Sequence, residues 1–464
     1  MTQTNFSSLS LKPGLLKNLE TIGYEYMTPI QAQSLPAILE GKDVIAQAKT
    51  GSGKTAAFGL GVLQKLNVKH FYVQTLILCP TRELADQVAK EIRTLARGIH
   101  NIKVLTLCGG MPFGPQKGSL EHGAHIIVGT PGRVEDHLRK KTLDLESCNT
   151  LVLDEADRML DMGFQDTLEK IIKYVPEERQ TLLFSATFPN QIKSISKKIM
   201  TTPVMVKVDT EHQESTIEQH FYRVGNSEQR LLGLRLLLLK HNPESALVFC
   251  NTKVETQNVN NELRSHGFSS VVLNGDLEQR DRDQMLVCFA NKTASILVAT
   301  DVAARGLDIA DLDLVINYEL AFDPEIHVHR VGRTGRAGNT GMACTLYSER
   351  DDYRMAVLKD YLNLEDMIQP ELLPSESLLD QPVKISSMQT IRIDGGKKQK
   401  IRAGDILGAL TGQNGIDGKE VGKINLADNW SYVAVTRDSV DKALRKLKDG
   451  KLKGRKFRAW IVKA

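Results

Sequence analysis

The 464-residue sequence predicts two α/β domains built on parallel sheets, followed by a smaller α+β domain of the ferredoxin-like type. The first observation is that short apolar runs alternate with amphipathic stretches between about residues 30 and 350. The second is a polar interruption of this alternation near residue 210. The third is a different order of predicted elements after residue 382, where basic residues also gather. At ~150 residues per domain, the length agrees with about three domains.

The first α/β domain is predicted over residues 1–208. Its apolar runs are short enough for buried strands, and such strands alternating with helices are typical of parallel sheets covered on both faces. An amphipathic stretch predicts a helix over Arg82–Leu95. The predicted strands are Val44–Ala46, Thr75–Cys79, His125–Gly129, Leu151–Leu153 and Thr181–Phe184.

The second α/β domain is predicted over residues 216–371, because the alternation restarts after the polar segment Asp209–Ser215. A helix is expected over Lys253–His266, and the segment Leu372–Gln381, which contains Pro and Ser, ends the domain. The predicted strands include Ala246–Cys250, Ser295–Ala299 and Leu314–Asn317.

The third domain is predicted over residues 383–464 and has the element order β-α-β-β-α-β of ferredoxin-like folds. From Pro382 onwards the chain carries 19 Lys and Arg against 8 Asp and Glu, a net charge of +11, whereas residues 1–381 carry a net charge of −7. Such a basic module commonly binds nucleic acid or another polyanion. Its predicted strands and helices are Met388–Ile393, Ala403–Leu410, Gly422–Leu426, Trp430–Thr436, Ser439–Lys448 and Lys456–Val462.

The composition, 41% hydrophobic and 25% charged, excludes a collagen or a wholly disordered chain. The first residues lack the pattern of a secretory signal, and no apolar run approaches the ~20 residues that span a bilayer. The six cysteines have neither metal-ligand nor redox spacing, so core thiols are expected. These features predict a cytoplasmic, reduced protein.

A Gly-rich loop, AKTGSGKT, follows the first predicted strand and precedes a helix-like run. In such a loop the small residues let backbone N–H groups face phosphate oxygens, and the start of the helix adds a partial positive charge. Lys54 is expected to reach the β- and γ-phosphates, and the Thr55 hydroxyl to hold Mg²⁺. A chance Gly-rich turn is the alternative. The predicted phosphate-binding residues are Ala48, Lys49, Thr50, Gly51, Ser52, Gly53, Lys54 and Thr55.

The string LVLDEAD ends a predicted strand with carboxylates. Asp154 is expected to hold Mg²⁺, and Glu155 to activate the attacking water. A solvated acidic strand end is the alternative. Together with the phosphate loop, these residues predict a nucleoside triphosphatase that uses ATP or GTP with Mg²⁺.

Further strings, SAT at 185–187, ATDVAARGLD at 299–308 and HRVGRTGR at 329–336, accompany DEAD at 154–157. Over about residues 6–350 the sequence closely resembles the DEAD-box RNA helicase family. The resemblance implies two RecA-like domains, with ATP and RNA bound between them. The string TPIQ resembles the family's Q motif, in which Gln31 would recognise adenine and Phe6 would stack on it. The resemblance further implies a ribose contact for Asp308 and contacts with the γ-phosphate for Arg333 and Arg336.

The same resemblance implies which residues bind RNA. Asn274 stands where the family usually has histidine before Gly-Asp. Ser185 and Thr187 would couple the state of ATP to RNA strand separation. The implied RNA-binding residues are Thr81, Arg82, Gly110, Thr130 and Arg133 in the first domain, and Thr252 and Thr300 in the second.

The basic third domain resembles an RNA-recognition domain (RRM), and its place in the chain is similar to that in a subfamily of bacterial ribosome-assembly helicases. This resemblance implies 23S ribosomal RNA as the partner. An RRM stacks bases on aromatic residues of its inner strands. Arg392 stands where one aromatic residue is expected, whereas Trp430 and Tyr432 are retained, and these three are the candidate RNA-binding residues. The dense basic run Lys446–Arg458 would contact the RNA backbone.

The sequence thus predicts an ATP-dependent RNA helicase that unwinds short duplexes during assembly of the large ribosomal subunit and acts as a monomer. Two alternatives remain open. One is an RNA clamp that ATP switches without productive unwinding, which the intact Glu155, Arg333 and Arg336 argue against. The other is a helicase that translocates on DNA.

Overall fold

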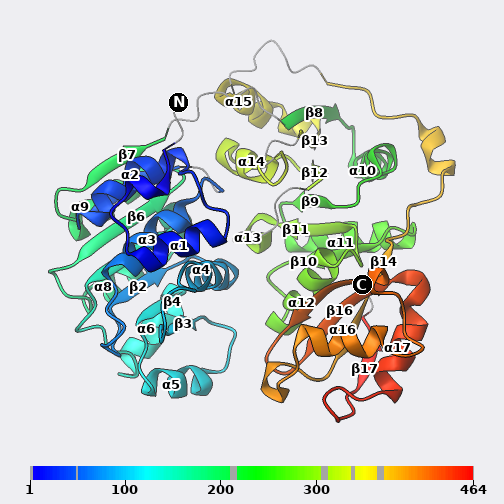
Figure 1. Ribbon diagram of the computed structural model, residues 1–464. Coiled ribbons are helices and arrows are strands. Elements are labelled where there is room, and N and C mark those ends of the chain that lie inside the picture. The colour runs from blue at the N-terminus through cyan, green and yellow to red at the C-terminus, as the bar shows by residue number, and fades with distance from the viewer. Residues whose placement is uncertain are drawn as a thin grey trace. The chain divides into compact units, whose positions relative to one another are not determined.

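The computed structural model describes residues 4–48, 51–208, 217–304, 312–335, 340–362 and 370–462 (Figure 1). They form two compact units, one holding the described residues up to 208 and the other those from 217 onwards. Lys49, Thr50, Asp308 and Arg336, all predicted site residues, lie outside the described residues. The described helices are too short or too polar to cross a membrane.

The first unit contains a seven-stranded sheet whose strands are all parallel, in the order β3-β4-β2-β5-β6-β1-β7. Residues of one strand alternate between the two cores: Ile77 packs into one, and Leu76 and Leu78 into the other. The strands are β1 Val44–Gln47, β2 Thr75–Leu78, β3 Val104–Leu107, β4 Ile126–Gly129, β5 Thr150–Asp154, β6 Gln180–Ser185 and β7 Val204–Lys207.

Helices cover both faces of this sheet, as its apolar strands predict. Helix α4 has the bounds expected from the sequence, and Thr81 begins it by accepting a hydrogen bond from the Leu84 N–H. The helices are α1 Pro13–Thr21, α2 Pro29–Leu39, α3 Lys54–Lys65, α4 Arg82–Leu95, α5 Phe113–Glu121, α6 Pro131–Arg139, α7 Ala156–Asp161, α8 Gln165–Ile172 and α9 Asn190–Ile199, with a 3-10 turn, η1, at Phe6–Ser8.

The second unit contains a six-stranded parallel sheet in the order β10-β11-β9-β12-β13-β8. Its strands are β8 Ile217–Arg223, β9 Ala246–Cys250, β10 Ser270–Leu273, β11 Ile296–Thr300, β12 Leu314–Asn317 and β13 Gly341–Tyr347. Its helices are α10 Ser227–His241, α11 Lys253–Ser265, α12 Gln279–Ala290, α13 Asp301–Ala304, α14 Pro324–Val331 and α15 Asp352–Leu362, with a 3-10 turn, η2, at Glu349–Asp351.

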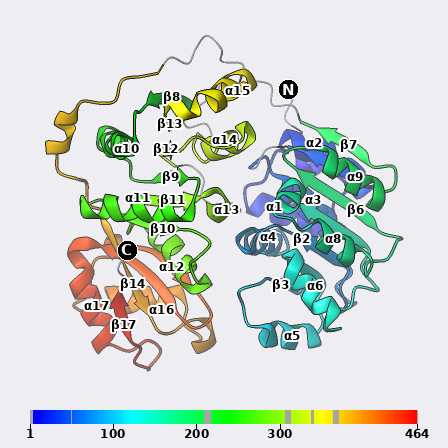
Figure 2. The ribbon, with the colours of Figure 1, turned by 180° about the vertical axis from the view of Figure 1, so that it is seen from behind.

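The C-terminal part of the second unit is an antiparallel sheet in the order β15-β16-β14-β17. This is the ferredoxin-like arrangement that the sequence predicts, and α16 and α17 share one core with the sheet (Figures 1 and 2). The elements are β14 Met388–Ile393, α16 Ala403–Thr411, β15 Val421–Leu426, β16 Ser431–Thr436, α17 Val440–Asp449 and β17 Ala459–Ile461, with 3-10 turns η4 Lys397–Gln399, η5 Gly418–Glu420 and η6 Arg437–Ser439.

The other face of this antiparallel sheet packs against the segment at the end of α12. The Thr390 hydroxyl, fully buried, lies 2.7 Å from the Thr293 hydroxyl and accepts a hydrogen bond of 3.3 Å from the Asn291 amide. The Ser386 hydroxyl donates to the Thr293 carbonyl over 2.7 Å. The face that binds RNA in many RRMs is therefore covered by the same chain here.

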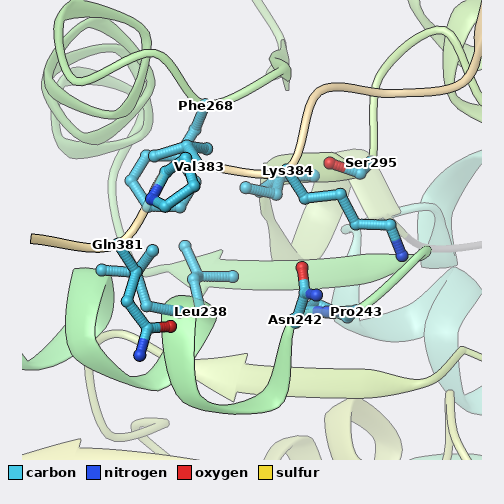
Figure 3. A pocket seen from close by; sticks show the side chains of 11 residues that line it. Leu238, Asn242, Pro243, Phe268, Ser295, Gln381, Val383 and Lys384 are labelled. Carbon is cyan, nitrogen blue, oxygen red and sulfur yellow. The ribbon is translucent and has the colours of Figure 1, made fainter. Parts of the chain in front are cut away.

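The segment 370–387, which leads into β14, also packs against the parallel-sheet part of the second unit. Its 3-10 turn η3, Glu376–Asp380, lies beside α10, and Val383 contacts the apolar core of the parallel sheet. Figure 3 shows Val383 and Lys384 beside Phe268, Leu238 and Asn242, lining a small cavity of about 60 Å³. The segment is thus held along the domain rather than being a free tether.

Candidate nucleotide and RNA sites

Most of the predicted site residues of the first unit lie after the carboxyl ends of its strands. Because all seven strands are parallel, these ends meet at one edge of the sheet. The strand order separates the residues into two blocks. Strands β3, β4 and β2 carry the predicted RNA-binding residues, and β5, β6 and β1 carry DEAD, SAT and the phosphate loop. SAT therefore lies between the other two ATP-site motifs.

The phosphate loop joins β1 to α3. Gly51 and Gly53 have φ values of 84° and 90°, which residues other than glycine rarely adopt. Lys54 is buried at the start of α3, and its ammonium donates to the Ala48 carbonyl over 2.7 Å. The buried Ser52 hydroxyl has no hydrogen-bond partner among the described residues. A buried hydroxyl at a helix N-terminus beside a lysine suits a phosphate oxygen.

Gln31 contacts this loop directly. Its amide nitrogen donates to the Gly53 carbonyl over 3.0 Å, and its amide oxygen accepts from the Thr28 N–H over 2.9 Å. A Cβ atom added at Gly53 would lie 2.4 Å from the Gln31 amide nitrogen. The side chain predicted to recognise adenine therefore also packs against the phosphate loop.

Phe6, predicted to stack on adenine, is only 2% exposed. Its ring lies 6.4 Å from that of Tyr24, at an interplanar angle of 22°. Tyr24, directly after the glycine of the Q motif, is more exposed and was not singled out from the sequence. The role of Phe6 stays a prediction.

The DEAD segment begins at the end of β5 and continues into α7. Burial is the main cause that raises the pKa of Asp154 to about 7, and the nearby Glu155 carboxylate raises it further, while the Lys54 ammonium opposes both. Glu155 has the left-handed backbone values φ 50° and ψ 51°, and its N–H donates to the Asp154 carboxylate over 3.0 Å. Its own carboxylate accepts from Arg158 over 2.8 Å.

The Asp154 carboxylate and the Thr55 hydroxyl could both bind Mg²⁺, which prefers oxygen ligands. A bound cation would compensate the buried Asp154 carboxylate, and Thr55 supplies a hydroxyl from the first turn of α3.

The last residue of DEAD is hydrogen-bonded to SAT. One carboxylate oxygen of Asp157 accepts from the Thr187 N–H and hydroxyl, over 2.9 and 3.0 Å, and from the Ala186 N–H over 3.2 Å. The Asp157 N–H donates to the Ser185 hydroxyl over 3.3 Å. Burial would raise the pKa of Asp157, but the hydrogen bonds from Thr187 and Ser185 outweigh burial and lower it. Ser185 and Thr187, the predicted coupling residues, are thus tied to the ATP site.

The predicted RNA-binding residues of the first unit follow neighbouring strands. Thr81 and Thr130 precede the first turns of α4 and α6. Gly110 has a φ of 71° in the turn after β3. Arg82 lies 3.8 Å from the Asp86 carboxylate, and Arg133 donates to the Met111 carbonyl over 2.8 Å. Two helix N-termini and two arginines at one edge supply N–H donors and positive charge of the kind that phosphates accept.

In the second unit, Thr252 follows β9, and Thr300 is the last residue of the adjacent strand β11. Thr252 accepts from the Glu255 N–H over 3.1 Å, and Thr300 is buried. Asn274, after β10, donates to the Thr256 hydroxyl over 3.2 Å and is therefore engaged within the domain.

Arg330, a residue that sequence reasoning missed, links the ends of three strands. Its buried guanidinium donates twice to Asp301, over 2.6 and 2.7 Å, and once each to Asn251 and to the Glu319 carbonyl, both over 2.7 Å. Arg333, one turn further, is also buried and donates to the His329 carbonyl over 3.3 Å. The spacing of the arginines in HRVGRTGR was visible, but only the fold shows that Arg330 points inward.

The candidate residues of the third domain lie together. The Arg392 guanidinium lies 5.0 Å from the Trp430 ring, 5.8 Å from that of Tyr432 and 5.1 Å from that of Trp460. Arg392 and Tyr432 are 4% and 2% exposed, and Arg392 donates to Gln284 of α12 over 3.4 Å. As packed, neither of these two side chains offers an open face to a base.

Family comparisons match the whole organisation. Residues 28–195 match the DEAD/DEAH box helicase family, residues 228–338 the helicase conserved C-terminal domain, and residues 390–461 the DbpA RNA binding domain. Among solved structures, Saccharomyces cerevisiae Dbp5 bound to RNA and ADP BeF3 is similar, with a TM-score of 0.73 and 30% identity, covering 81% of this chain and 96% of that one.

Curated relatives extend the similarity to the full length. The chain is 53% identical to the ATP-dependent RNA helicase DbpA of Escherichia coli K12, over 99% of this chain and all of that protein. It is 36% identical to the ATP-dependent RNA helicase DbpA of Bacillus subtilis 168, over 98% of both chains. With its DEAD segment, phosphate loop and C-terminal RNA-binding domain in the same order, the chain belongs to the DbpA family of DEAD-box ATP-dependent RNA helicases.

Proposed function

We propose that this helicase unwinds short RNA duplexes in 23S ribosomal RNA during assembly of the large ribosomal subunit, acting as a cytoplasmic monomer. The observation that carries the proposal is the full-length similarity to DbpA proteins, which includes the third domain. The charge of +11 after residue 381 supports a polyanionic partner for that domain.

In the proposed cycle, ATP and RNA together bring the two α/β domains into contact, and closure bends one RNA strand. Lys54 binds the β- and γ-phosphates, Gln31 the adenine, and Asp308 the ribose, while Arg333 and Arg336 approach the γ-phosphate from the second domain. Thr55 and Asp154 hold Mg²⁺, which supplies charge compensation to the phosphates when bound. Similarity to Dbp5 bound to RNA and ADP BeF3 supports this arrangement.

Glu155 orients and activates the attacking water in this proposal. The hydrogen bonds between Asp157 and Thr187 give SAT a direct link to the DEAD segment. Through that link, a change at the phosphates reaches Ser185 and Thr187 and is coupled to strand separation.

Two substitutions test the ATP site. Lys54→Ala removes the cation at the phosphates, so both ATP binding and turnover should fall.

Glu155→Gln keeps size and polarity but removes the base, so ATP and RNA should still bind while hydrolysis falls at least ~100-fold. Multiple-turnover ATPase, strand displacement and nucleotide-dependent RNA binding measure these effects. Hydrolysis at the wild-type rate by Glu155→Gln would exclude the assigned base. Nucleotide-dependent RNA binding without strand displacement by the wild-type chain would favour the clamp.

The third domain offers RNA a basic surface away from its covered sheet face. A hollow of about 410 Å³ beside α17 is lined by four cations, Lys442, Arg445, Lys446 and Lys451, together with Asn414 and Asp449 among others. Because backbone contacts position RNA without reading its sequence, we propose that this surface supplies affinity. Arg392, Trp430 and Tyr432 remain candidates for base contacts only where the sheet face becomes accessible.

Charge reversal in the full chain tests this surface. Lys442→Glu with Lys451→Glu should weaken binding of large-subunit rRNA and lower the log–log salt slope by about 1.5, if each lysine meets one phosphate. The matched control is Lys397→Glu with Lys423→Glu, which makes the same charge change on exposed lysines of that domain outside the hollow. Equal losses in both pairs would show that only net charge matters.

A further inference from the structure

Arg158 forms an ion pair with Glu155 inside the first unit. One guanidinium nitrogen, Nη1, donates to Glu155 Oε2 over 2.8 Å, and the two side chains are only 5% and 7% exposed. Placing two charges out of water is costly unless they remain paired, so this pair is not an incidental surface contact.

The backbone fixes Glu155 from the other side. Its φ of 50° is unusual for a residue with a long side chain, and its N–H is bonded to the Asp154 carboxylate. Arg158 lies three residues later, in the first turn of α7, on the same short segment as Glu155. The backbone and one carboxylate oxygen of Glu155 are therefore both held by residues within three positions of it.

The other buried groups near this pair have their own partners. Asp157 accepts from SAT, and the Lys54 ammonium donates to the Ala48 carbonyl in the phosphate loop. The Arg158 guanidinium is thus the group that donates to the Glu155 carboxylate. Because the pair is local, motion of whole domains can occur without separating it, and separating it would leave a buried charge unpaired.

We infer that Arg158 is a positioning residue for ATP hydrolysis: by holding Oε2 of Glu155, it fixes the carboxylate so that Oε1 meets the attacking water. The inference rests on the proposed role of Glu155 as the group that activates water. An orienting bond of this kind matters because a small misplacement of a reacting group can cost a large factor in rate.

Arg158→Met tests the inference, because methionine fills space but cannot donate. The RNA-stimulated kcat should fall about 10- to 100-fold, while KM for ATP and RNA affinity with a non-hydrolysable analogue change less than about 3-fold. Arg158→Lys should recover part of the loss. In a Glu155→Gln background, Arg158→Met should change the single-turnover rate less than about 3-fold, because no carboxylate is left to orient.

Arg179→Met is the matched control, since Arg179 is a partly buried arginine that donates to the Pro176 and Ile199 carbonyls. Its kcat should stay near that of the wild type. If Arg158→Met loses analogue-dependent RNA binding through misfolding, Arg158→Lys carries the test, with an expected kcat between about 3- and 30-fold below wild type.

A wild-type kcat in Arg158→Met, or in Arg158→Lys when that variant carries the test, would overturn the inference. So would a full additional loss from Arg158→Met in the Glu155→Gln background. If instead the proposed role of Glu155 is wrong, Glu155→Gln alone will hydrolyse ATP at the wild-type rate, so the two failures can be told apart.

Discussion

At the scale of single residues, Asp157 and Thr187 carry the link that we propose between ATP and RNA. Thr187→Val keeps the shape and the backbone hydrogen bond but removes the hydroxyl that donates to Asp157. We expect ATP hydrolysis to stay within a few-fold of wild type and strand displacement to fall about 10-fold, with a loss of stability of about 1 kcal/mol. Both rates are measured on one preparation, with Thr106→Val, in β3, as the control. Equal losses of hydrolysis and displacement would argue against a coupling role.

At the scale of single residues, the sequence indicated candidate site residues more readily than the hydrogen bonds that these residues make. Lys54, Asp154 and Glu155 could be identified because strand ends and Gly-rich loops have recognisable spacing. The bond from Arg158 to Glu155 could not, since it depends on a positive φ that residue propensities do not predict at a glutamate.

Helices α5 and α6 provide a prediction at the scale of elements. His137 of α6 stacks on Phe113 of α5, with ring centroids 4.1 Å apart, and both ring nitrogens are bonded, to Thr142 and Gln116. Burial, and next the nearby Arg133 guanidinium, lower the pKa of His137 to about 4. Between about pH 4 and about pH 6.5 the folded state then binds fewer protons at His137 than the unfolded state does. The contribution of this residue to the free energy of unfolding is therefore fully present above about pH 6.5 and is lost as the pH decreases towards 4.

His137→Gln removes this titration. Between pH 7 and pH 5 the variant should lose less stability than wild type, by about 2 kcal/mol at pH 5. The thermal unfolding midpoint, followed by circular dichroism, measures the difference, and His100→Gln at an exposed position is the control. Parallel pH dependence of His137→Gln and wild type would contradict the account.

Secondary structure was predicted best where local signals agreed. Apolar runs and a capping threonine define α4, and the alternating pattern of the third domain defines its strands to within a few residues. Strand β8, with the run IEQHFYR, is only partly buried and more polar, so no bounds were predicted for it. The partly buried β7, VMVK, was not predicted either. All six cysteines are buried and free, as expected from their spacing.

At the scale of the whole chain, the packing of the third domain was beyond sequence reasoning. Thr390 and Thr293 are almost 100 residues apart, and no sequence pattern in either segment predicts that they are in contact. The sequence indicated Arg392, Trp430 and Tyr432 as candidate RNA-binding residues, and the structure buries Arg392 and Tyr432. We therefore propose that RNA meets exposed surfaces of the third domain first, and the basic hollow beside α17 is our candidate for that contact.

The central claim is that the full chain is an ATPase stimulated selectively by large-subunit ribosomal RNA. The most direct measurement is steady-state ATPase activity of the full chain, at fixed ATP and salt, titrated with 23S rRNA or with an unrelated transcript of the same length. We predict half-maximal stimulation at an RNA concentration at least about 10-fold lower for 23S rRNA, because a single favourable base or shape contact is worth about 1–3 kcal/mol. Coincident titration curves would contradict the claim.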